Sequence, residues 1–206
     1  MCQTLGMQGG GGNSVDYFDL FFDEVMEFRR GLRSETDRGC ALMAAAYLDD
    51  QLGRLLQSVL VDDAKAVDEL LGPSGALGTF SSRIEACYAL GLLPPLARRD
   101  LHLIRKVRNE FAHTPSPRTF EDSPIASRCS ELHYAFVVIS GRARGKFTNA
   151  ALGVCAVIHA KLARSARPDI ASDANPSEAA KQEMRQVVDE LADEIERQEQ
   201  DARGNA

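Results

Sequence analysis

The sequence has no tryptophan, few aromatic residues and little that favours β-structure. Aromatic side chains make up 6% of the 206 residues, and the run at 137–139, Val-Val-Ile, is the one strand-like stretch. Alanine, leucine, arginine and glutamate, which favour helices, are frequent instead. This composition argues against a sheet-dominated fold and predicts an all-α protein, a single helical bundle with a further amphipathic helix appended at the C-terminal end.

Long apolar runs and signs of export or metal binding are also missing. No apolar stretch reaches the roughly 18 residues that span a bilayer, and the N-terminus is glycine-rich instead of basic and then apolar. The five cysteines are far apart and include no Cys-x-x-Cys pair, so they favour reduced, mostly buried thiols. We expect a soluble cytoplasmic protein that makes no membrane contact and needs no metal and no cofactor.

Changes in composition along the chain predict four segments. Residues 1–14 are a glycine-rich leader that buries nothing, 15–166 form the helical bundle, 167–177 are a linker with two prolines, and 178–206 are an acidic amphipathic helix and tail. The last segment carries nine acidic and three basic residues between Glu178 and Asp201, which accounts for the whole net charge of −6. Its narrow apolar stripe is typical of a coiled-coil seam or of an arm that docks loosely.

Within the bundle, turn and cap residues predict where helices begin and end. The predicted helices are Ser14 or Asp16 to Arg30, Ser34 to about Val61, Asp62–Leu71, Thr79–Gly91, Leu96–His113, Ser127 to about Val138, and Lys146–Arg164. Thr79 is the predicted N-cap of its helix, and Gly91 lies near the C-terminus of the same helix. The glycine-rich loop at 72–78 lacks the spacing of a phosphate-binding loop, so we expect a shaped turn in which Gly75 or Gly78 has positive φ or packs closely.

The first helix is unusually rich in phenylalanine. Phe18, Phe21, Phe22 and Phe28 lie on one broad apolar surface together with Val25 and Met26. Such a surface indicates either core packing or a helix–helix contact between two copies of the chain, and we expect a homodimer.

The segment Leu101–His113 is the one whose polar residues are placed for chemistry. At about 100° per residue, its apolar side chains cluster on one side of a helix: Ile104, Val107 and Phe111. The other side gathers polar groups: Arg105, Arg108, Asn109 and His113. This arrangement indicates either a solvated helix face or a site that binds an anion. A second basic run, Gly141–Lys146, indicates either a solvated turn or phosphate contacts by Arg142, Arg144 and Lys146, with Arg105 as a further candidate.

Two resemblances are carried by particular residues. Arg108 to His113, Arg-Asn-Glu-Phe-Ala-His, resembles the Arg-Asn-x-x-x-His motif of the HEPN superfamily, whose members are small helical bundles and often metal-independent ribonucleases. A longer set of segments, Gly72–Ile84, Tyr88–Leu92 and Asp100–His113, resembles the core of the mannitol operon repressor family. The second resemblance covers about a fifth of the chain and keeps its order and spacing.

These resemblances imply two functions of different classes. The repressor family implies a non-catalytic helical regulator in negative control of transcription. No segment has the pattern of a helix-turn-helix with a basic recognition helix, so action through a protein partner is favoured over direct DNA binding. The partner would contact the phenylalanine-rich first helix or the acidic C-terminal helix.

The HEPN resemblance implies instead an endoribonuclease or RNA-processing protein with a site shared across a dimer. His113 would be the general acid or base, Arg108 would stabilise charge on the phosphate, and Asn109 would orient them. Whether the protein is an enzyme therefore stays open, and we prefer the regulator because the longer resemblance supports it.

Overall fold

The structure, a computed structural model, describes residues 14–113, 116–135, 141–171 and 176–204. These residues form eight α-helices and no strand, which confirms the all-α prediction. The chain divides into two compact units, Met1–Asp169 and Ile170–Ala206.

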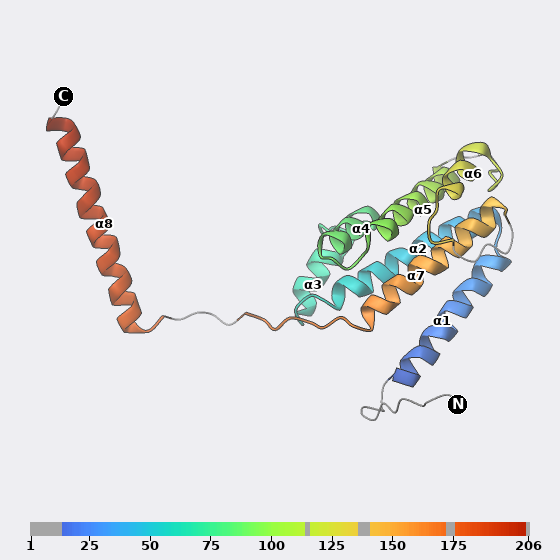
Figure 1. Cartoon of the computed structure of the whole chain (residues 1–206), viewed down its shortest axis with the longest axis horizontal. Coiled ribbons are helices and arrows are strands. Elements are labelled where there is room, and N and C mark those ends of the chain that lie inside the picture. Colours follow the sequence, from blue (N-terminus) through green and yellow to red (C-terminus); the bar gives the residue numbers. More distant parts are fainter. Residues whose placement is uncertain (1–13, 114–115, 136–140, 172–175, 205–206) are drawn as a thin grey trace, which may run out of the picture. The chain divides into compact units, whose positions relative to one another are not determined.

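The first unit is a helical bundle built around α2. Its helices are α1 (Ser14–Ser34), α2 (Asp37–Gln57), α3 (Ala64–Leu71), α4 (Phe80–Ala89), α5 (Pro95–His113), α6 (Ser123–Ser130) and α7 (Ala143–Leu162). Figure 1 shows α2, α5 and α7 lying side by side, and α2 also contacts α1 and α4. The short helix α3 follows the C-terminal end of α2, and α6 packs on α5 and α7.

Aliphatic and aromatic side chains from all seven helices form one core. The predicted stripe on α2 is fully buried: Leu48, Leu52, Leu55 and Leu56. Where α5 and α7 meet the segment before α6, Phe120 packs between Phe111 and Phe147, with ring centroids 5.0 and 5.1 Å apart. Burying each such side chain contributes about 1.5–3 kcal/mol, so this aromatic cluster holds the α6 segment on the bundle.

Local chemistry determines several helix ends, and those at Thr79 and Gly91 are as predicted. The Thr36 hydroxyl accepts a hydrogen bond from the Gly39 N–H at 3.0 Å and caps α2. Thr79 caps α4 in a capping box with Ser82. After α4, Gly91 has φ of 67°, and the Leu92 N–H donates to the Cys87 carbonyl at 2.8 Å, which closes the helix in a left-handed cap.

The 72–78 loop is a shaped turn that depends on close approach. Gly91 is the one described glycine with positive φ, so neither Gly75 nor Gly78 needs that conformation. A Cβ atom at Gly75 would overlap the carbonyl oxygens at the end of α3, and one at Gly78 would overlap the carbonyl of Gly72. The prediction of close packing is therefore confirmed, and the alternative of positive φ is not needed.

Several predicted helix boundaries in the bundle are wrong. α2 ends at Gln57 instead of Val61. α6 begins at Ser123 instead of Ser127, because Pro124 lies in its first turn, where a missing N–H costs nothing. The same helix ends at Ser130 instead of near Val138. α7 begins at Ala143 instead of Lys146, so Arg144 and Lys146 belong to a helix and not to a loop. The run 137–139 and the side chains of Phe18, Phe21 and Phe22 lie outside the described residues.

The second unit contains one helix, α8 (Glu178–Gly204), which is longer than the predicted end near Gln198. Its apolar side chains are 51–61% exposed: Met184, Val187, Val188, Leu191 and Ile195. None of the described helices, in either unit, is both long enough and apolar enough to cross a bilayer.

Candidate functional site

The polar face of α5 is partly engaged in contacts within the bundle. Arg108 is half-buried, and its Nη1 donates to the Asn109 Oδ1 at 3.0 Å, so the amide fixes the guanidinium. Arg105 is also half-buried, whereas His113 is exposed in the last turn of α5. The structure thus brings Arg105, Arg108 and Asn109 together on one face, with His113 at the end of the helix.

A carboxylate on α2 balances part of this positive charge. Burial raises the pKa of Asp49, while Arg83, whose Nη1 lies 3.0 Å from the Asp49 Oδ1, and the charge of Arg108 oppose that rise. The charge of Arg108, on α5, therefore acts on a carboxylate of α2 that pairs with Arg83 of α4. The catalytic roles of Arg108, Asn109 and His113 stay predictions.

Asp100 is a buried acid that the sequence did not single out. Its carboxylate is fully buried in α5 and accepts hydrogen bonds from the His133 N–H at 3.0 and 2.9 Å and from the Tyr134 N–H at 2.7 Å. One signal was present in the sequence, because Asp100 occupies a core position of α5, four residues before Ile104 and seven before Val107. An acid at such a position needs buried donors, and here it anchors the chain that leaves α6.

A pocket with four arginines in its lining lies between α1 and α7, and we call it the arginine pocket. Its cavity has a volume of about 380 Å³. It is lined by Arg29, Arg33, Arg142, Arg144, Gly145, Thr148 and Asn149. Two of the predicted phosphate contacts, Arg142 and Arg144, lie there, whereas Lys146 and Arg105 do not line it. Arg29 and Arg33 were not predicted as site residues, although their spacing of four residues places them on one face of α1.

Arg144 positions the arginine pocket instead of presenting a free charge to it. Its guanidinium lies 2.8 Å from the Asp37 carboxylate and donates to the carbonyls of Leu32, at 3.1 Å, and Glu35. These bonds tie the first turn of α7 to the corner between α1 and α2. The corner therefore holds Arg33 and Arg142 at the same end of the bundle.

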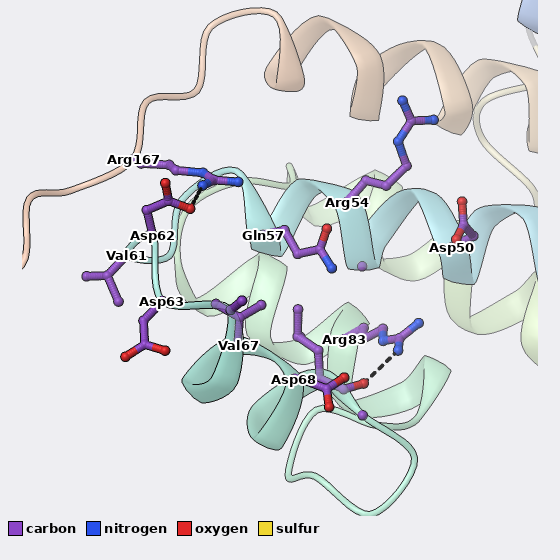
Figure 2. A pocket seen from close by; sticks show the side chains of 14 residues that line it. Asp50, Arg54, Gln57, Val61, Asp62, Asp63, Val67, Asp68, Arg83 and Arg167 are labelled. Atoms are coloured by element: carbon purple, nitrogen blue, oxygen red, sulfur yellow. Dashed lines mark hydrogen bonds and ion pairs between the residues drawn. The ribbon is translucent and has the colours of Figure 1, made fainter.

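A second pocket, of about 450 Å³, lies between α2, α3 and α4 and has mixed charge. Figure 2 shows Arg83 bonded to a main-chain oxygen, that of Leu71, at 3.0 Å, and Arg167 paired with Asp62. Arg54, which also lines the pocket, pairs with Glu24 at 3.1 Å. The cations of this pocket are thus already neutralised by the protein itself.

The described part of the chain contains no candidate centre for metal or thiol chemistry. It contains no group of three or more His, Cys, Asp or Glu side chains that would hold a metal ion. Four cysteines are free and buried: Cys40, Cys87, Cys129 and Cys155. Burial raises the pKa of Cys87, Cys129 and Cys155 to about 12, so these thiols are not nucleophiles at neutral pH.

The described residues thus form an α-helical bundle in which many polar clusters tie helices together and four arginines line a pocket between α1 and α7. The family model of the mannitol repressor, MtlR, matches residues 23–143. Because this match covers more than half of the chain, the protein belongs to the mannitol repressor family. No curated protein matches the sequence.

A comparison of folds agrees with the family. A chain in the X-ray structure of the MtlR–HPr complex from Escherichia coli superposes with a TM-score of 0.58 at 22% sequence identity, and the match covers 68% of this chain and 99% of that chain. The predicted family and the predicted repressor-like regulator are confirmed. The comparisons give no support to the ribonuclease alternative.

Proposed function

We propose that this protein is a negative regulator of transcription that acts by binding a protein partner. The observation that carries the proposal is the match to the mannitol repressor family over residues 23–143, most of the helical bundle. The similar bundle from Escherichia coli was solved as a complex with HPr. An HPr protein of the same organism is therefore the partner to test first.

The corner between α4 and α5 is the surface of the bundle that best suits such a partner. Tyr88, Leu90 and Leu96 are 37%, 56% and 39% exposed there, and we call these three residues the apolar corner. The Arg98 guanidinium lies 4.6 Å from the centre of the Tyr88 ring and also pairs with Glu85 at 2.8 Å. Aromatic and arginine side chains are enriched at the centres of protein interfaces, and a fixed arginine beside exposed apolar groups supports binding here.

The two partner surfaces expected from the sequence differ in exposure. In the first helix, Phe28 is buried and its ring stacks on Tyr47 with centroids 4.0 Å apart, so this residue belongs to the core. The stripe of α8 is exposed and keeps the dimer proposal open, as a coiled-coil seam between two copies.

Isothermal titration calorimetry of the full chain with HPr tests the proposal. We expect saturable binding by the wild type, and binding weakened about tenfold or more by Leu90→Asp, because a charge would be desolvated in an apolar contact. Leu42→Asp is the matched control, since Leu42 is an exposed leucine, 37% accessible, on α2 outside the apolar corner. Absence of binding by the wild type would contradict the partner, and equal binding by Leu90→Asp would contradict the surface.

Three further features are part of the proposal. A cytoplasmic location is supported by the four free, buried thiols of the described residues. The segment 15–166 is proposed to be one domain, supported by the shared core of α1 to α7, with 167–177 as linker and 178–206 as an appended acidic helix. Direct contact with DNA or RNA is not part of the proposed mechanism.

A further inference from the structure

The arginine pocket holds more positive charge than its neighbours neutralise. Arg144 is paired with Asp37 at 2.8 Å, but Arg29, Arg33 and Arg142 form no ion pair with any residue that the structure describes. Three guanidinium groups around a cavity of about 380 Å³ repel one another. A negatively charged group between them would replace this repulsion by attraction.

The backbone at the pocket adds to the same preference. α7, a helix of 20 residues, begins there, its N-cap residue Arg142 makes no side-chain capping bond, and its first turn has no acidic residue. The positive end of a helix dipole disfavours cations and favours anions. Gly145, in this first turn, also lines the pocket and has no side chain to cover the nearby N–H groups.

From this arrangement we propose that the arginine pocket binds the phosphate group of a small molecule, either inorganic phosphate or a phosphomonoester. Guanidinium groups bind phosphate oxygens in a forked geometry, and the two negative charges of a phosphate offset most of the charge of the three unpaired arginines. The volume lies in the lower part of the range for small-ligand pockets, roughly 300–1,000 Å³. The proposal is independent of the protein partner, because the pocket lies between α1 and α7 and the apolar corner lies between α4 and α5.

Binding at this place has a mechanical consequence within the bundle. Arg29 and Arg33 come from the last turns of α1, and Arg142 precedes α7, so a bound phosphate joins the end of one helix to the start of the other. A ligand that binds only the folded protein raises its stability. The full chain should therefore unfold at a higher temperature in phosphate than in chloride of equal ionic strength.

Thermal unfolding of the full chain with inorganic phosphate, glucose 6-phosphate or glucose tests the proposal. The test variant is Arg33→Gln combined with Arg142→Gln, because both side chains are exposed and their loss leaves the core intact. The control is Arg30→Gln, an exposed arginine on the same helix that does not line the pocket. Amide resonances of Ala143 to Gly145, followed by NMR in the same titrations, report whether the ligand is at the start of α7.

The expected result is a rise of the unfolding temperature with both phosphates and none with glucose, with affinity about tenfold or more lower in the double variant and unchanged in Arg30→Gln. Tighter binding of glucose 6-phosphate than of phosphate would identify an esterified ligand, and equal binding would identify free phosphate. The proposal is overturned if neither phosphate binds, if the double variant binds as the wild type does, or if only a single-stranded RNA oligonucleotide binds.

Discussion

Replacement of Asp100 tests how the bundle is held together. The buried carboxylate accepts from two main-chain N–H groups, those of His133 and Tyr134, at 2.7–3.0 Å. Asp100→Ala leaves both donors without this acceptor, and a buried unsatisfied group costs about 1–3 kcal/mol. The sum of two such costs is reduced because His133 is exposed, so water can solvate its N–H group after the substitution. We therefore expect a total loss of about 2–4 kcal/mol in the free energy of unfolding.

Asp100→Asn separates the charge of the carboxylate from its shape. The amide keeps one acceptor oxygen but places an NH₂ group among donors, so we expect a smaller loss, about 1–2 kcal/mol. Urea unfolding followed by circular dichroism measures both variants, with the exposed Asp50→Ala as a control that should stay within about 0.5 kcal/mol of the wild type. A loss below about 1 kcal/mol for Asp100→Ala would show that this carboxylate does not hold the segment after α6 on the bundle.

Three other perturbations follow from the structure. Gly75→Ala, whose Cβ would overlap carbonyl oxygens at the end of α3, should lower stability by about 1–3 kcal/mol in urea unfolding, whereas Gly141→Ala, with open space around it, should not. Burial lowers the pKa of His159 below its usual 6.5, so the unfolded chain binds this proton more tightly than the folded protein does. The free energy of unfolding should therefore fall as the pH drops below about 6.5, and His159→Gln should reduce that pH dependence. Wild-type protein and His113→Ala should be equally inactive on single-stranded RNA in EDTA, with stabilities within about 1 kcal/mol because His113 is exposed; cleavage that His113→Ala abolishes would revive the ribonuclease hypothesis.

Helix ends were predictable where the signal is local. Thr36, Thr79 and Gly91 act on backbone groups within four or five residues, and the sequence contains both members of each contact. The starts of α6 and α7 were missed because the rule against proline and glycine in helices was applied to first turns. Pro124 is tolerated there, since the N–H groups of a first turn have no helical partner. Gly145 costs the helix some conformational entropy but no hydrogen bond, so it does not prevent α7 from starting at Ala143.

The candidate sites depend on contacts between segments that are far apart in the sequence. Hydrophobic periodicity within one helix does not predict such contacts. The acceptor Asp100 meets donors 33 and 34 residues later, and only its place in a core stripe indicated that donors were needed. The basic run after Gly141 suggested phosphate contacts at Arg142 and Arg144. That Arg29 and Arg33 lie beside them depends on how α1 packs on α7, which no local pattern in the sequence indicates.

Transcripts that rise when this protein is deleted report on negative control through a protein partner. A strain lacking this protein is complemented with the wild type, Leu90→Asp or the control Leu42→Asp, and protein levels are matched. The account predicts that wild type and Leu42→Asp lower the transcripts, while Leu90→Asp, altered in the apolar corner, does not. Full repression by Leu90→Asp would contradict the proposed surface, and unchanged transcripts with the wild type would contradict the account.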